Sequence, residues 1–264
     1  METARVNKIL FSFVLLMSNA YSFAQLNESD TARVQLRAGL TGAWQQGNVS
    51  LLTLRSRLEA VSNGMKPLVF KTQNNSLYQE FGNRKADNDI SSRNYLYYRP
   101  TNKVYPFAMA YLQTNYRRQI SFRWFAGVGA TWQLVQKPRS NLKLSASLVY
   151  EQTQFKSSIY NETVYNGNDQ INLWRATAYL SGWHQLFHQR MRLYYTAYWQ
   201  PALDGNNNYR TQLDAGIDFP VWKGLSFTAL YTFAHEEVVV QKVKQDDRIL
   251  TFGLSYQFRK NNTP

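Results

Sequence analysis

The stretch Tyr209–Phe219, which reads YRTQLDAGIDF, decides the fold of this chain. Its side chains alternate between two sets, one with Leu213 and Ile217 and the other with Arg210 and Asp218. A period of two residues is the signature of a β-strand whose two faces meet different surroundings. The stretch therefore predicts a strand with one apolar face and one charged face.

The same alternation recurs along the chain, between turn signals rich in Gly, Asn, Asp and Pro. Most of the runs are longer than the ~5–6 residues typical of strands in soluble sheets, and they are close to the ~9–11 residues that a tilted strand needs to cross a bilayer. Strand length therefore favours a membrane. We predict about twelve strands, within a range of about 10–14, over residues 34–45, 49–61, 68–81, 92–99, 107–116, 121–135, 142–155, 171–183, 190–200, 209–219, 225–235 and 247–258.

Composition narrows the class further. The 264 residues include 30 Lys and Arg, 17 Asp and Glu and no Cys, and aromatic residues make up 15%. So much apolar surface excludes an intrinsically disordered chain. The absence of Cys excludes disulfide frameworks, thiolate metal sites and Cys nucleophiles, without arguing against export.

The first residues read as an export signal. Arg5 and Lys8 give a basic start, Ile9–Met17 is an apolar run, and Ser22–Ala24 forms a small-x-small cleavage pattern. The alternative is a retained membrane anchor, but the run has about half of the ~20 residues that a spanning helix needs. We predict a signal peptide over 1–24, an N-terminal extension over 25–33, a barrel over 34–258 and a tail over 259–264.

The polar faces of the strands carry many charges. A soluble sandwich or a lipocalin-like barrel would bury the apolar face in protein, whereas a membrane barrel turns it to lipid and keeps a polar lumen. We predict an all-β fold, a closed antiparallel up-and-down transmembrane β-barrel, because closure also removes the unpaired strand edges that lipid does not tolerate. The side chains expected in its lumen are Arg55, Arg57, Glu59, Glu151, Arg175, Arg192, Arg210, Asp214, Asp218 and Arg248.

Loops and aromatic residues give further expectations. If both chain ends lie at one end of the barrel, the connections at that end are short, and those at the other end include longer ones at 82–91, 156–170, 201–208 and 236–246. Aromatic residues cluster near the ends of the runs, as expected of two interfacial girdles. They are Trp44, Tyr95, Tyr97, Tyr98, Tyr111, Tyr116, Trp183, Tyr198, Trp199 and Trp222.

Several short stretches resemble a known family. They are Gly47-Asn48, GVGA at 127–130, DAGIDFP at 214–220, LSFTALY at 225–231 and LSYQF at 254–258. Over nearly the whole mature chain the sequence resembles the domain-of-unknown-function 481 family, also labelled putative salt-induced outer membrane proteins. The resemblance implies an outer-membrane β-barrel and brings no reaction, ligand or catalytic residue with it. Phe258 resembles the terminal aromatic signal of such barrels, although six residues follow it.

Side chains able to carry chemistry are few. His184 and His188 are four residues apart, a zinc spacing only on a helix, and they flank a predicted turn. His235 stands beside Glu236 and Glu237, and a Ser-His-acid hydrolase would also need a serine at matching depth, such as Ser255, Ser91 or Ser92.

Two acid pairs, Glu236-Glu237 and Asp246-Asp247, bracket one loop and offer oxygen ligands to a divalent cation, but they lack the spacing of a calcium loop. Gly127 and Gly129 lie on a polar strand face, where they permit close packing or curvature. We therefore assign no catalytic, cofactor-binding or metal-ligating residue and expect no cofactor.

These observations predict an outer-membrane β-barrel of the envelope of a double-membraned bacterium, reached after export and signal cleavage. We expect a structural or stress-related protein with a largely filled lumen, not an enzyme. The alternatives are a narrow anion-biased channel and a membrane-embedded lipid hydrolase. The expected partners are outer-membrane lipids, lipopolysaccharide and the barrel-assembly machinery, and nucleic acid is not among them because the chain is exported.

Overall fold

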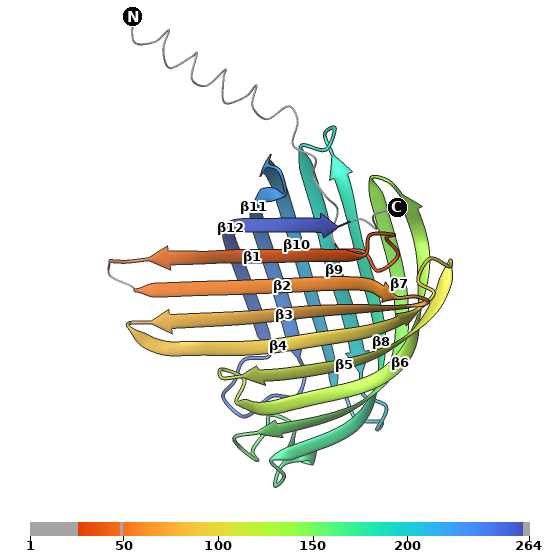
Figure 1. The fold of residues 1–264 in the computed structure, drawn as a ribbon. Helices are drawn as coiled ribbons and strands as arrows, with labels where there is room; N and C mark the ends of the chain where they lie inside the picture. The colour runs from red at the N-terminus through yellow and green to blue at the C-terminus, as the bar shows by residue number, and fades with distance from the viewer. Residues whose placement is uncertain (1–25, 48–49, 261–264) are drawn as a thin grey trace, which may run out of the picture.

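A computed structural model describes residues 26–47 and 50–260, and they form one closed barrel of twelve antiparallel strands (Figure 1). The predicted fold class and strand number are confirmed. The strands are β1 (Val34–Gln45), β2 (Leu51–Met65), β3 (Leu68–Phe81), β4 (Arg84–Tyr98), β5 (Val104–Asn115), β6 (Ile120–Lys137), β7 (Ser140–Phe155), β8 (Gln170–Leu186), β9 (Met191–Pro201), β10 (Tyr209–Trp222), β11 (Leu225–Glu236) and β12 (Asp246–Lys260).

Each strand pairs with its neighbours in the chain, and the first strand pairs with the last. This β1–β12 seam runs from Val34 opposite Lys260 to Gly42 opposite Phe252. Because the seam closes the sheet, no strand is left with an unpaired edge. Among the described residues, no helix is long and apolar enough to cross a membrane.

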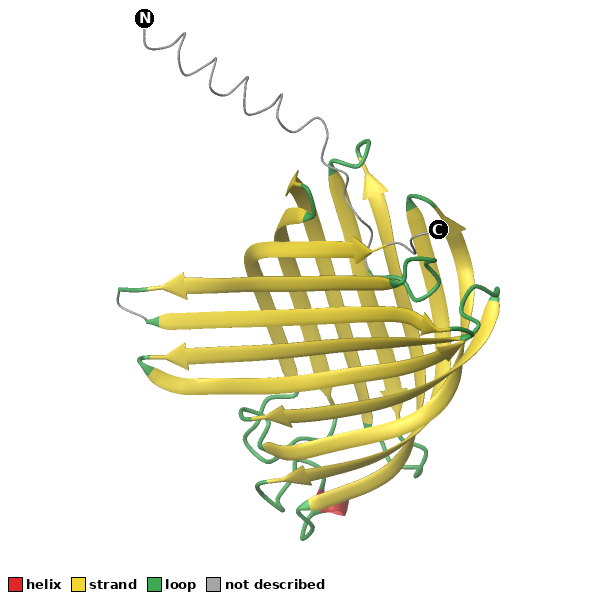
Figure 2. Ribbon diagram, viewed as in Figure 1, coloured by secondary structure: helices red, strands yellow, loops and turns green. Residues whose placement is uncertain are grey.

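The two ends of the barrel differ in their connections (Figure 2). At the terminal end, where Val34 and Lys260 lie, turns of two to five residues join the strands. At the loop end, the connections after β7 and β11 are the longest, covering residues 156–169 and 237–245. The loop predicted at 82–91 is wrong, because β4 already begins at Arg84 after the turn at Gly82-Asn83. The polar residues of this segment resemble a loop in the sequence, but polar side chains can also face the lumen. Asp87 does so and is fully buried.

The predicted division of the chain needs one adjustment. β12 continues through Arg259 and Lys260, two residues beyond the predicted barrel end at 258. The predicted signal peptide and residues 261–264 lie outside the described residues.

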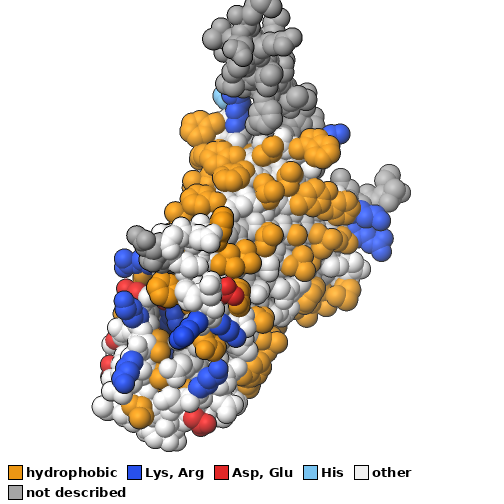
Figure 3. Space-filling view, turned by 90° about the vertical axis from the view of Figure 1, so that its left-hand side faces the viewer, with side chains coloured by type: hydrophobic (Ala, Val, Ile, Leu, Met, Phe, Trp, Pro, Cys, Tyr) orange, Lys and Arg blue, Asp and Glu red, His pale blue; other side chains and the backbone are white. Residues whose placement is uncertain are grey.

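The outer surface of the barrel is apolar over most of its circumference. Figure 3 shows hydrophobic side chains covering much of the wall, while charged side chains gather toward one end of the molecule. Hydrocarbon chains can cover such a wall because neighbouring strands of a closed sheet pair their backbone groups with one another along the ladders. Exposed apolar side chains include Leu36, Leu40, Leu54, Leu58, Phe122, Val128, Leu144, Leu148, Trp174, Phe227, Leu250, Phe252 and Leu254.

Only part of the aromatic set predicted to form interfacial girdles is exposed on the outside of the barrel. Trp44, Tyr98, Tyr116, Trp199 and Trp222 are exposed. The buried members instead belong to the inward parity of their strands and pack inside the barrel. These are Tyr95, Tyr97, Tyr111 and Trp183, and the half-buried Tyr198 also faces inward, where its hydroxyl donates to Gln212 Oε1.

Gly127 allows β6 and β7 to approach closely. A Cβ at this position would overlap the carbonyl oxygen of Leu148 and lie 2.7 Å from the Cα of Val149. We expect Gly127→Ala to lower the free energy of unfolding by about 1–3 kcal/mol, the usual cost of overpacking. Urea titration of the folded gel band measures this. Gly64→Ala is the control, since its Cβ would meet only Ser62 Oγ, at 3.6 Å, and equal stability of the two variants would contradict the prediction.

Candidate functional site

The candidate site is the lumen, which polar side chains fill. Of the ten predicted lumen charges, nine lie on inward-facing positions and one does not. Arg248 shares the parity of Leu250 and Phe252 and lies on the outer wall, with its side chain 67% exposed and its guanidinium 5.5 Å from the ring centre of Phe233. The nine inward residues are Arg55, Arg57, Glu59, Glu151, Arg175, Arg192, Arg210, Asp214 and Asp218.

The loop-end half of the lumen is organised around Glu151 on β7. This carboxylate is 2% exposed and pairs with Arg210 and, at 3.1 Å, with Arg175 Nε. Arg123 Nε lies 3.7 Å from the Glu151 carboxylate, and the Thr153 hydroxyl donates a 3.0 Å hydrogen bond to Glu151 Oε1. One buried anion therefore contacts three arginines from three different strands, and Arg123 makes a second and closer ion pair with Glu236, at 2.8 Å.

The terminal-end half repeats this arrangement around Asp218 on β10. Arg37 of β1 binds both of its carboxylate oxygens, at 2.8 and 3.1 Å, and Arg192 of β9 pairs with it as well. Thr228 donates a 2.7 Å hydrogen bond to it. Glu59, which is fully buried, pairs with Arg57 in the same half of the barrel wall. Ion pairs thus join β10 to the adjacent β9 and, across the lumen side of β11 and β12, to β1.

Residues 26–33, which precede β1, fold across the terminal end of the lumen, and we call them the plug. Glu28 accepts hydrogen bonds from Lys143 Nζ and from the hydroxyl of Tyr105, both at 2.7 Å, and pairs with Lys71 Nζ at 3.1 Å. Ser29 Oγ donates to the carbonyl of Pro100 at 2.6 Å. The plug is therefore bound to strands on several sides of the barrel.

Apolar packing and electrostatics both hold the plug. Leu26 is 2% exposed and packs in a cluster with residues that include Val61, Val69 and Tyr97. Burial would raise the pKa of Glu28, but the charges of Lys143 and Lys71 and the hydrogen bonds from Lys143 and Tyr105 outweigh burial. They hold that pKa well below its usual range, so Glu28 is an anion at neutral pH.

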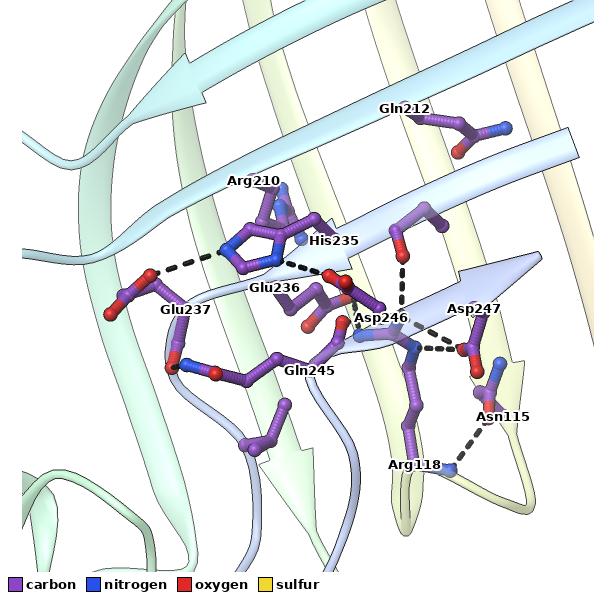
Figure 4. A network of polar contacts seen from close by, with 12 residues as sticks. Asn115, Arg118, Arg210, Gln212, His235, Glu236, Glu237, Gln245, Asp246 and Asp247 are labelled. Atoms are coloured by element: carbon purple, nitrogen blue, oxygen red, sulfur yellow. Dashed lines mark hydrogen bonds and ion pairs between the residues drawn. The ribbon is translucent and has the colours of Figure 1, made fainter.

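A turn narrows the lumen at the loop end (Figure 4). Arg118, in the turn between β5 and β6, is 4% exposed and reaches Asp247 of β12 at 2.9 Å. It also donates to the carbonyls of Ala234 and Gln245, each at 3.3 Å. Arg117 adds a second ion pair to Asp247, at 2.8 Å. The turn is thus fastened to strands that are more than a hundred residues away in the chain.

Between the plug and this turn lies a polar cavity of about 100 Å³, lined by residues of most of the strands. Arg55 reaches it and donates a 2.6 Å hydrogen bond to the hydroxyl of Thr232. Arg93 also lines it, with its guanidinium 5.4 and 5.6 Å from the ring centres of Tyr111 and Tyr198. Arg93 thus rests against neutral rings, whereas Arg55 also interacts electrostatically with Asp89 and Asp214, which line the same cavity.

The histidines occupy three different settings. His184 Nδ1 lies 2.8 Å from Ser140 Oγ, and its Nε2 lies 3.1 Å from the hydroxyl of Tyr195. His188 lies in the exposed turn after β8. His235 contacts Asp246 at 2.7 Å and Glu237 at 3.2 Å (Figure 4).

The two acid pairs do not converge on one point. Glu236 pairs with Arg123, at 2.8 Å, and Asp247 with Arg117 and Arg118, whereas Glu237 and Asp246 face His235. Each of the four carboxylates is therefore paired with a cationic or imidazole group. Within the part of the chain that the structure describes, no cluster of three or more His, Asp or Glu is arranged to hold a metal ion.

Sequence reasoning missed about half of the lumen charges. Arg37, Arg123 and Lys143 lie on the inward parity of their strands, so extending the alternation strictly would have found them. Glu28 and Arg118 carry no such signal, because they lie outside the strands and meet their partners only through the tertiary fold.

The barrel is similar to solved structures of outer-membrane proteins. The NanC porin is 9% identical over 84% of this chain and 98% of that one, with a TM-score of 0.50. The translocator domain of the autotransporter NalP from Neisseria meningitidis is 14% identical over 97% and 96%, with a TM-score of 0.45. The transport unit of AIDA-I from Escherichia coli is 13% identical over 94% and 97%, with a TM-score of 0.41. At these identities the likeness concerns the fold alone.

Sequence comparison shows the family. Among curated proteins, no relative of the chain was found. The family model described as "Protein of unknown function, DUF481" matches residues 25–258, nearly all of the chain. The fold that this resemblance implied is the one that the structure has, and the chain belongs to the DUF481 family.

Proposed function

We propose that this protein is a structural or stress-related outer-membrane β-barrel of a double-membraned bacterium, with a lumen closed to the passage of solutes. The observation that carries the proposal is the plug, whose Glu28 joins Lys143 of β7 to Lys71 of β3 across the terminal end. The ion pairs around Glu151 and Asp218 fill the space behind it. The lumen is organised as a cross-braced interior, not as an open pore.

The same geometry supports an orientation in the membrane. In this orientation the short turns, the start of β1 and the end of β12 face the periplasm, and the longer connections at 156–169 and 237–245 face outward, as in other bacterial barrels. Lipids and lipopolysaccharide would surround the apolar wall, and the barrel-assembly machinery would insert it after removal of the signal peptide. We propose no enzymatic activity and no nucleic-acid partner.

Planar-bilayer recording tests the closed lumen. We expect the purified wild-type barrel to insert without giving discrete conductance steps, because the plug and the ion pairs block the path. Insertion is verified by heat-modifiable gel migration of the same sample. Regular steps from the wild-type protein would contradict the proposal.

A narrow anion-biased channel is the second candidate. It is favoured by Arg93, which lines the cavity and contacts only the neutral rings of Tyr111 and Tyr198 among its described partners, and by Arg55, which lines the same cavity beside Asp89 and Asp214. Anion-selective steps that lose selectivity in the variant with Arg55→Ala and Arg93→Ala would support the channel over the closed barrel.

A further inference from the structure

One part of the outer wall is polar where the rest is apolar. On β3 and β4, the side chains of Thr72, Asn74, Ser76, Ser92 and Asn94 face outward, and we call them the polar stripe. Their direction follows from the register, in which Thr72 lies opposite Asn94 and Asn74 opposite Ser92. The same parity carries Phe70, Ile90 and Leu96, which are 37, 53 and 39% exposed.

The polar stripe lies at the middle of its strands. β3 runs from Leu68 to Phe81 and β4 from Arg84 to Tyr98, so Asn74 and Ser92 are near the centre of each. At the same place on β6 and β7 the outward side chains are apolar, as Val128 and Leu148 show with 64 and 45% exposure. Hydrocarbon offers no hydrogen bonds, so amides and hydroxyls at this depth are unfavourable in contact with lipid.

Contacts within the stripe satisfy its groups only in part. Asn74 donates a 3.1 Å hydrogen bond to Thr72, and Asn94 donates a 3.0 Å hydrogen bond to Ser92. Each amide has two N–H donors and an acceptor oxygen, so one bond leaves both asparagines with further hydrogen-bonding capacity. The stripe therefore needs a polar neighbour within the membrane.

We propose that a second copy of this chain covers the polar stripe and forms a two-fold dimer in the membrane; this rests on the proposed membrane location. All copies insert the same way up, so an axis along the membrane normal brings stripes of equal depth together. Asn, Ser and Thr are both donors and acceptors, so the stripe is complementary to itself. It carries no charge that would repel a second copy.

The residues beside the stripe favour close contact. Ala60 of β2 lies opposite Thr72, and Ala110 and Ala108 of β5 lie opposite Asn94 and Leu96. Small side chains let two walls approach until polar groups can bond across the interface, as they do between transmembrane helices. The alanines make this face of the barrel flatter than the leucine-rich and tryptophan-rich faces.

Single-cysteine cross-linking tests the dimer, and the chain has no Cys of its own to interfere. Thr72→Cys, Asn74→Cys and Asn94→Cys are made one at a time, and isolated envelopes are treated with a bifunctional maleimide. The matched control is Leu148→Cys, an outward mid-strand position on the other wall. We expect linked dimer from stripe variants in about tenfold greater yield than from the control. In the Thr72→Cys variant, adding Asn74→Leu and Asn94→Leu should lower the yield to the control level.

Each other result overturns the inference. Equal yields from stripe and control positions, from barrels that fractionate with the membrane and shift on heating, would reject the dimer and leave the proposed location intact. Cross-linking of stripe cysteines to a different protein, without dimer, would show that another partner covers the stripe. Recovery of the wild-type chain as a soluble protein would reject the location and the dimer together.

Discussion

Glu28→Lys is expected to expel the plug from the lumen. The substitution places a third cation beside Lys143 and Lys71, whose Nζ atoms lie 2.7 and 3.1 Å from the Glu28 carboxylate. Loss of one partner of a buried ion pair costs about 3–5 kcal/mol. In a Ser29→Cys background, reaction of the thiol with a polar maleimide should therefore become about a hundredfold faster. Ser29 is a suitable reporter because it is 6% exposed in the intact protein.

The control for charge is Asp169→Lys, an equal change at an exposed position of the loop end, and it should leave the labelling rate unchanged. Lowering the pH should also release the plug, because it protonates Glu28. The pKa of Glu28 in the folded protein is lowered from 4.5. Its contribution to the stability of the bound plug is therefore complete above about pH 4.5 and is lost as the pH falls through the folded pKa. Equal labelling of the Glu28→Lys and parent proteins would show that the plug is not held by this anion.

Glu151→Gln is expected to destabilise the whole barrel. The amide keeps the shape of the side chain but removes the carboxylate from between Arg175, Arg210 and Arg123, of which Arg123 keeps its pair with Glu236. We expect the free energy of unfolding to fall by about 3–5 kcal/mol, read as an earlier loss of the folded gel band in urea.

Adding Arg210→Gln to this variant should restore part of the stability, because it removes one of the three mutually repelling cations. The restoration appears as a non-additive term in the double-mutant cycle. Glu162→Gln, at the loop end, serves as the control and should change the unfolding free energy by less than about 0.5 kcal/mol. A similarly small effect of Glu151→Gln would mean that the ion pairs around Glu151 do not stabilise the barrel.

The strand pattern of the sequence was sufficient to predict the wall of the barrel. Residues 209–219 and 225–235 alternate strictly because one face meets lumen groups and the other meets an apolar medium, and both stretches are strands. The pattern failed at β4, where Ser92 and Asn94 face outward although they are polar, while Tyr95 and Tyr97 face inward. Hydropathy indicates the face of a strand only where the outer medium is apolar.

Charge type alone was a poor guide at Arg248. Its position relative to Leu250 already placed it on the outer parity, where it lies near the loop end of β12 and rests against Phe233. The plug is the opposite case. Residues 26–33 have no periodicity, and their binding depends on Lys71, Tyr105 and Lys143, which only the closed barrel brings together. No local signal in the sequence could reveal it.

The β1–β12 seam has a consequence for how the barrel folds. Val34 and its partner Lys260 lie at opposite ends of the wall in the sequence, so they can pair only after all of the intervening chain is available. Until then the incomplete sheet has two unpaired strand edges, on β1 and on the last strand added, and unpaired edges favour aggregation. A molecule that has not yet added Asp246–Lys260 to its sheet therefore has two open strand edges on which a second copy can pair.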